Sequence, residues 1–100
     1  MNLQEAVAKA REQSDDMVLV AKPPFTWASE ARYIELTDEF CVPSHIADEG
    51  YQVVLDHEDL ITQLDYLAEK KTSDRTAAEF VAHYAVHDDW PAWFNDLKEA

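Results

Sequence analysis

Residues 51–68, with the sequence YQVVLDHEDLITQLDYLA, carry a strand pattern that passes directly into a helix pattern. Residues 51–55 are rich in aromatic and β-branched side chains, which favour extended backbone. Asp56 follows at a position where a side-chain oxygen commonly caps a helix, and over residues 60–67 leucine and isoleucine recur at the i, i+3/i+4, i+7 spacing of one helix face. The stretch therefore predicts a strand, an Asp cap and an amphipathic helix over about residues 57–71, which places the chain in the α+β class.

The residues before this stretch predict a first helix and a central strand. Asn2 and Glu5 form a capping-box pattern, and a helix over about residues 3–13 is expected to follow from it. Residues 17–21, MVLVA, form an uninterrupted apolar run, which is typical of a strand buried on both faces, and two prolines end the run soon afterwards. We therefore expect residues 17–21 to form the central strand of the sheet.

A hairpin is expected after the central strand. Residues 32–37 alternate apolar and polar side chains, and residues 40–42 can pair with them across an acidic turn. Residues 44–50 are expected to form a loop or a single helical turn. Cys41 would then be a small core residue of the hairpin, because no basic group adjoins it to favour the thiolate of a nucleophile.

The C-terminal third predicts further helices. Thr76 and Glu79 form a second capping-box pattern, which opens a helix whose apolar face includes Phe80. A short final helix is expected over residues 91–98. The predicted fold is a single domain, residues 1–100, with an N-terminal helix, a small antiparallel sheet of three or four strands, and two or three C-terminal helices packed on one sheet face.

The charge of the chain is strongly one-signed. Its 100 residues include 21 Asp or Glu and 8 Lys or Arg, for a formal net charge of −13. Such a charge repels the phosphates of DNA, RNA and anionic membranes, so direct binding to any of these is not expected. The negative charge is complementary to a basic surface on another protein.

Many of the acidic residues gather in a window, residues 33–69, that contains no Lys or Arg. A surface normally mixes both signs, because like charges repel one another and oppose compaction. The window therefore predicts a partner-binding surface made from its ten acids: Glu35, Asp38, Glu39, Asp48, Glu49, Asp56, Glu58, Asp59, Asp65 and Glu69. The same charge pattern is also compatible with a solvated face that has no partner, and with adaptation of the protein to high salt.

The sequence does not favour an enzyme. Gly50 is the only glycine, so a Gly-rich phosphate loop cannot form, and no cofactor or catalytic residue is predicted. Pairs of carboxylates arise by chance among 21 acidic residues. His83 and His87 stand at the i, i+4 spacing that can bind one metal ion, but they adjoin the apolar face of their helix, so no metal site is predicted.

The cysteine content and the hydropathy pattern favour a cytoplasmic protein. A single cysteine excludes an intramolecular disulfide framework. The first residues lack a basic segment followed by an apolar one, and the longest apolar run is far too short to span a bilayer. We expect neither secretion nor a membrane span, and either a monomer or a homodimer.

Three aromatic residues near the C-terminus, Trp90, Trp93 and Phe94, have two interpretations. Aromatic side chains at helical spacing usually complete a core, which is the interpretation we favour. Alternatively, part of their surface lies outside the core and anchors a partner.

From residue 32 to residue 69 the order is strand, acidic turn, strand, short loop, aromatic strand, Asp-rich cap and amphipathic helix with a late aromatic residue, carried mainly by residues 33–39, 51–59 and 64–67. Over residues 32–69, this order and its charge resemble the acidic, DNA-mimicking type of phage anti-CRISPR protein. The resemblance implies a non-enzymatic inhibitor in the host-cell cytoplasm, whose acids occupy the positively charged DNA-binding groove of a CRISPR effector. The alternative function is an acidic immunity protein or antitoxin that neutralises a basic toxin or nuclease.

Overall fold

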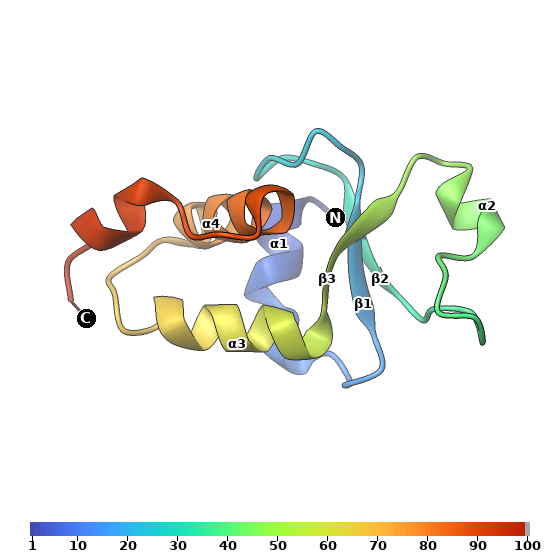
Figure 1. Cartoon of the computed structure of the whole chain (residues 1–100), viewed down its shortest axis with the longest axis horizontal. Coiled ribbons are helices and arrows are strands. Elements are labelled where there is room, and N and C mark those ends of the chain that lie inside the picture. The colour runs from blue at the N-terminus through green and yellow to red at the C-terminus, as the bar shows by residue number, and fades with distance from the viewer. Residues whose placement is uncertain (100) are drawn as a thin grey trace.

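Figure 1 shows the computed structural model, which describes residues 1–99 of the chain. Its elements are, in order, α1 (Leu3–Ala8), the 3-10 helix η1 (Ala10–Glu12), β1 (Val18–Ala21), β2 (Ala31–Ile34), α2 (Ser44–Ala47), β3 (Gln52–Asp56), α3 (His57–Leu67), α4 (Asp74–His87) and the 3-10 helix η2 (Ala92–Asp96). An N-terminal helix, a three-stranded antiparallel sheet and C-terminal helices make a small α+β fold, as the sequence predicts.

The sheet has the strand order β2-β1-β3, and both neighbours of β1 run antiparallel to it. All four residues of β1 are buried, which confirms the predicted central strand. The pairing of β1 with β3 shifts by one residue after Leu19, and Val54 is the extra residue of the resulting β-bulge. The bulge lets two consecutive residues, Val54 and Leu55, both join the main core.

Different helices pack on the two faces of the sheet. Helices α1, α3 and α4 lie on one side of the sheet, and α2 lies on the other (Figure 1). The main core lies beneath the three larger helices and includes Leu3, Leu60 and Phe80, which are fully buried. A smaller second core joins Val20 of β1 to Ile46 of α2. The central strand is therefore apolar throughout because neither of its faces meets solvent.

The predicted hairpin over residues 32–42 is wrong. β2 pairs with β1, and the chain then closes a tight turn in which the Phe40 N–H donates to the Thr37 carbonyl at 2.8 Å. Phe40 has a φ of 61°, in the left-handed region, so the backbone does not continue as a strand. Cys41 is consequently exposed, and its prediction as a core residue is also wrong. The following segment forms α2, which is the predicted single helical turn.

Two of the three predicted helix caps are confirmed. Asn2 Oδ1 accepts a hydrogen bond from the Glu5 N–H at 2.9 Å, and the Glu5 carboxylate accepts one from the Asn2 N–H at 3.1 Å. Asp56 Oδ1 accepts from the Asp59 N–H at 2.8 Å at the start of α3. These bonds satisfy backbone donors that have no partner within the helix.

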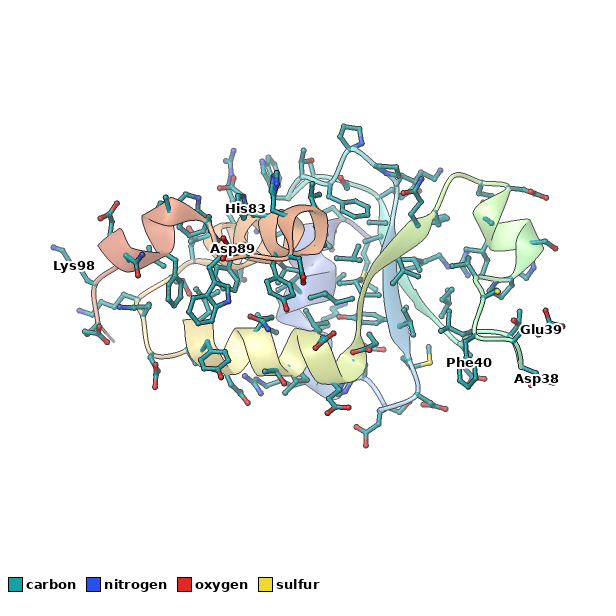
Figure 2. The ribbon with its side chains drawn as sticks, viewed as in Figure 1. Asp38, Glu39, Phe40, His83, Asp89 and Lys98 are labelled. Carbon is teal, nitrogen blue, oxygen red and sulfur yellow. The ribbon has the colours of Figure 1, made fainter. Side chains whose placement is uncertain are left out.

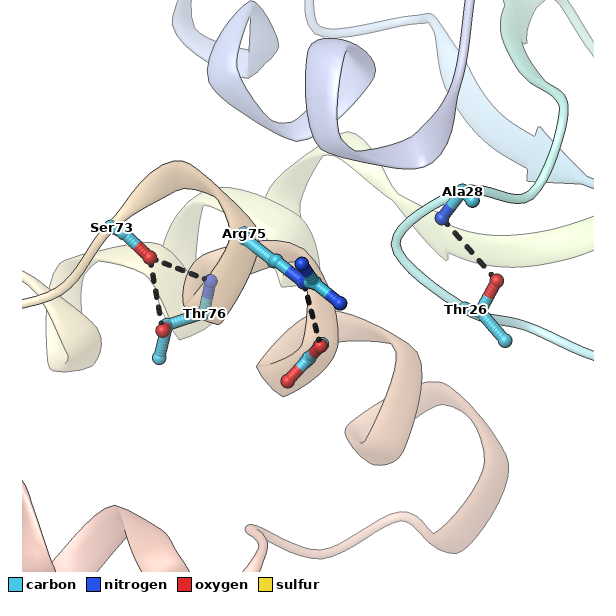
Figure 3. Close-up of polar contacts among 6 residues, drawn as sticks. Thr26, Ala28, Ser73, Arg75 and Thr76 are labelled. Carbon is cyan, nitrogen blue, oxygen red and sulfur yellow. Dashed lines mark hydrogen bonds and ion pairs between the residues drawn. The ribbon is translucent and has the colours of Figure 1, made fainter.

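The third cap lies earlier than predicted. Helix α4 begins before Thr76, because Ser73 Oγ accepts from the Thr76 N–H at 3.1 Å. Figure 3 shows this cap together with Arg75, whose Nε lies 3.5 Å from a carboxylate oxygen of Glu79. The Arg75 guanidinium also lies 4.3 Å from the centre of the Trp27 ring, so it connects α4 to the loop between β1 and β2.

The other helices are shorter than the sequence predicts. α1 ends at Ala8 and is followed by η1, α3 ends at Leu67, and the final segment forms the 3-10 helix η2. Among the residues that the structure describes, no helix has both the length and the apolar composition needed to cross a bilayer.

Candidate functional site

The ten acidic residues predicted to bind a partner are all exposed. They come from the end of β2, the turn after it, α2, the end of β3, and α3 with the turn that follows. Exposure alone does not join them into one surface. The hollows that they share and the charges near them show which of them lie together.

The longest row of acids follows α3. Glu58, Asp65 and Glu69 succeed one another at spacings of seven and four residues, which puts them on one side of the helix and the turn after it. Thr62, Asp65 and Glu69 line a shallow hollow of about 310 Å³. Thr62 and Glu58 line a second hollow of about 370 Å³. Because Thr62 borders both hollows, the row forms one continuous acidic edge.

Asp15 and Asp16, in the loop before β1, extend this edge beyond α3. Asp15 lines the same hollow as Glu58, and its Oδ1 lies 3.6 Å from Nδ1 of His57. Asp16 lines a third hollow, of about 280 Å³, together with Glu35. Since Asp15 and Asp16 are consecutive, the loop before β1 borders both the second and the third hollow.

We call six of these acidic residues the acidic track: Asp15, Asp16, Glu35, Glu58, Asp65 and Glu69. The track follows α3 and then passes the start of β1 to the end of β2. Asp38 and Glu39 lie on the next turn, at the opposite end of the molecule from Lys98 (Figure 2). Asp56 stands where β3 meets α3, and its carboxylate is occupied by the cap of α3.

Two of the predicted acids lie at a distance from the track. Asp48 and Glu49 follow α2, and Glu49 is near Lys22, which comes directly after the last residue of β1. The hydrogen bond to the Glu30 carboxylate, 2.9 Å away, is the main reason that the pKa of Lys22 is raised, and Glu49 adds to this effect. Asp16 precedes the first residue of β1, so these acids lie at the other end of the strand from the track.

Asp59 lines none of the hollows of the track, and its charge acts on Tyr84 of α4. Burial raises the pKa of the Tyr84 hydroxyl, and the negative charges of Asp88 and Asp59 raise it further. The ten predicted acids thus do not form a single surface.

One base from outside the window reaches the track. Arg11, in η1, lies 2.7 Å from the Asp65 carboxylate, and both side chains are more than half exposed. An exposed ion pair of this kind contributes little to stability, about 0–1 kcal/mol. It nevertheless leaves Asp65 less available to a cationic partner than Glu58 or Glu69, for which no ion pair is found among the described residues.

The C-terminal aromatic residues divide between core and surface. Phe94 is buried in the main core, and the half-buried Trp93 packs against it, as the favoured interpretation predicts. Trp90 is 38% exposed, and its Nε1–H donates to the Gln63 side chain at 2.7 Å. Its ring lies 5.2 Å from that of Tyr66, which is 47% exposed and borders the hollow of Asp65 and Glu69. Of the three candidate anchors, only Trp90 presents an exposed ring beside the track.

The histidine pair lies apart from the acidic track. The His83 and His87 rings on α4 lie with centroids 4.4 Å apart and their planes tilted by 39°. Within residues 1–99, no group of three or more His, Cys, Asp or Glu side chains is arranged to hold a metal ion. The described geometry thus provides no candidate metal centre.

The sequence alone does not indicate that Asp15, Asp16 or Tyr66 belongs to the site. The two aspartates lie outside the base-free window, and in the sequence they indicate only a break before a strand. Their consecutive charges are the one available signal. Tyr66 is hidden among the apolar positions of α3, although it lies beside Asp65 and is not part of the buried face.

Phe40 is the most exposed large apolar residue, at 84%. Its left-handed backbone costs an L-residue about 1–2 kcal/mol, a cost that glycine does not incur. We expect Phe40→Gly to raise the free energy of unfolding by about 0.5 kcal/mol, because relief of this strain outweighs the entropy that glycine adds to the unfolded chain. Urea denaturation measures the change. A fall of more than about 1 kcal/mol would show that the ring contributes to the fold.

Comparison of the chain with models of protein families, with curated proteins and with solved structures finds no match to any of them.

Proposed function

We propose that this protein is a non-enzymatic inhibitor that places its acidic track in the basic nucleic-acid-binding groove of another protein, either a CRISPR effector or another DNA-binding protein. The observation that supports the proposal most is the continuity of the track. Three hollows are lined by carboxylates from α3, the loop before β1 and the end of β2; two of them share Thr62, and the consecutive Asp15 and Asp16 link the second to the third. No other run of acids in residues 1–99 is joined in this way by the hollows described above.

The spacing of the carboxylates suits a groove made for phosphates. Glu58, Asp65 and Glu69 stand seven and four residues apart, which is about 10.5 and 6 Å along the helix axis at a rise of about 1.5 Å per residue. The phosphates of one DNA strand recur about every 3.4 Å along the duplex axis. A rigid helix edge therefore offers Lys and Arg side chains negative charges at a density of the same order as DNA.

The exposed aromatic pair gives the track an apolar neighbour. Charge complementarity mainly accelerates association, whereas tight binding depends on a few desolvated anchors. Tyr66 and Trp90 lie at the end of α3 beside Glu69, and the hydrogen bond from Trp90 to Gln63 fixes the orientation of the indole. The pair can therefore be buried by a partner that first meets the acidic edge.

The direct test is capture from lysate with washes of rising salt. The probe is the tagged full chain, compared with two double variants of equal charge. Glu58→Lys/Glu69→Lys changes the track, and Asp48→Lys/Asp96→Lys changes exposed acids outside it. Each double variant shifts the net charge from −13 to −9, because two charges of −1 become +1. Asp65 is left unchanged because a lysine there would face Arg11.

The proposal predicts capture of a nucleic-acid-binding protein that is released by salt, retained by the control variant and lost by the track variant. Equal loss with both variants would show that only net charge matters. Capture of a single toxin or nuclease would favour the immunity or antitoxin function. If no protein is captured, the acidic residues form a solvated face that has no partner.

A further inference from the structure

The hollow at the Glu35 end of the track has a different lining from the other parts of the track. Its walls include three apolar side chains, those of Val18, Leu36 and Phe40, as well as the carboxylates of Asp16 and Glu35. Val18 is buried, Leu36 is half-buried and Phe40 is almost fully exposed at the rim. Figure 2 shows the Phe40 ring projecting from its turn. The hollow thus combines an apolar wall, an aromatic face and two negative charges within about 280 Å³.

We propose that this hollow receives one arginine side chain of the protein partner. This inference deepens the proposed function and rests on it for the nature of the partner. The methylene groups of arginine would pack against Val18 and Leu36, and the guanidinium would lie between the two carboxylates and the Phe40 ring. Charge complementarity and an apolar wall together select this occupant, because a neutral apolar side chain would leave the carboxylates unpaired.

Arginine suits the hollow better than lysine for two physical reasons. Its planar guanidinium binds a carboxylate through two parallel hydrogen bonds and stacks on an aromatic face, which a compact ammonium group does not do. It is also more weakly hydrated, so less solvation is lost when it enters a partly apolar hollow. Phe40 and Glu35 lie on the same hollow, where one guanidinium can use both groups.

Hydrogen bonds close the backbone of the turn that carries Phe40. The Thr37 N–H donates to the Cys41 carbonyl at 2.9 Å, and the Cys41 N–H donates to Thr37 Oγ1 at 3.2 Å. Phe40 keeps its left-handed backbone inside this closed loop. Little conformational freedom is therefore left to lose when a side chain is bound against the ring.

The experiment uses the full chain and needs no identified partner. N-acetyl-arginine amide is titrated into labelled protein, and NMR follows the methyl groups of Val18 and Leu36 and the ring of Phe40. N-acetyl-citrulline amide, which has nearly the same shape and no charge, and N-acetyl-lysine amide are the comparison probes. We expect saturable shifts centred on these three residues with the arginine probe, at least fivefold weaker binding of the lysine probe and no saturable binding of the citrulline probe.

Two variants separate the hollow from general electrostatics. Phe40→Ala is expected to weaken binding of the arginine probe at least fivefold, and Val86→Ala, at an exposed apolar residue of α4, is expected to leave it unchanged. Equal shifts along the whole track, equal binding of the citrulline probe, or unchanged binding to Phe40→Ala would overturn the inference. Binding of the probe to Glu58→Lys/Glu69→Lys should persist. The inference can therefore fail while capture by the track succeeds, and capture can fail while the hollow binds arginine.

Discussion

Phe80→Ala is expected to lower the free energy of unfolding by about 3–5 kcal/mol. Phe80 is fully buried, and its ring lies 5.3 Å from that of Phe94 and 6.3 Å from that of Trp93, measured between centroids. The substitution removes the transfer free energy of the ring and leaves a cavity among aromatic neighbours that cannot fully close. Because a domain of this size is stable by only about 5–15 kcal/mol, a large part of the stability is lost.

Urea denaturation of both proteins measures this effect. Phe40→Ala is the matched control, because it removes the same ring from an exposed turn and is expected to change the free energy of unfolding by less than about 1 kcal/mol. A loss below about 1 kcal/mol for Phe80→Ala would contradict the core described here.

Glu58→Lys/Glu69→Lys is expected to weaken binding to the captured partner by about 100-fold at low salt. Each replacement removes an attraction and introduces a repulsion, and a loss of about 1.4 kcal/mol per position corresponds to tenfold in affinity. Both side chains are exposed, so the fold should be retained apart from a small helix-dipole cost at Glu58 in the first turn of α3. Most of the change should lie in the association rate and shrink as salt rises.

Surface plasmon resonance at several salt concentrations tests this prediction, with circular dichroism to establish that both variants are folded. Asp48→Lys/Asp96→Lys should change the affinity by less than about fivefold, since its positions lie outside the track. If the two variants lose equal affinity, the binding depends on net charge and not on the track.

The elements predicted correctly are those set by neighbouring residues. The strand, the Asp56 cap and the amphipathic helix follow one another within residues 51–68, and each depends on local backbone geometry or helix periodicity. The central strand was also predictable, because the uninterrupted apolar run at residues 17–21 requires cover on both faces.

The errors concern competition between alternatives that local sequence does not rank. Residues 32–42 carry a hairpin pattern, yet β2 pairs only with β1 within the named strands, and Phe40 turns the chain with a left-handed backbone in place of a second strand. Ser73 and Thr76 can both cap a helix, and the earlier one does so because its hydroxyl reaches the Thr76 N–H. Propensity rules give no preference between such candidates without tertiary packing.

The candidate site was only partly predictable for a similar reason. The charge window identified the acids of α3 and β2, because their residues are close in sequence. It could not show that Arg11 pairs with Asp65 or that Asp15 lies beside Glu58, since both relations join segments more than 40 residues apart. Side-chain burial could not be predicted from the sequence either. It places Phe94 in the core and Trp90 at the surface.

Competition with nucleic acid is the most direct test of whether the acidic track occupies a nucleic-acid-binding groove. The captured protein is bound to a fluorescent duplex oligonucleotide, the chain is added in increasing amounts, and anisotropy reports the bound fraction. We expect the chain to displace the duplex, and about 100-fold more Glu58→Lys/Glu69→Lys protein to be needed for the same effect. A duplex that stays bound while the chain also binds, in a ternary complex, would contradict occupation of the nucleic-acid groove.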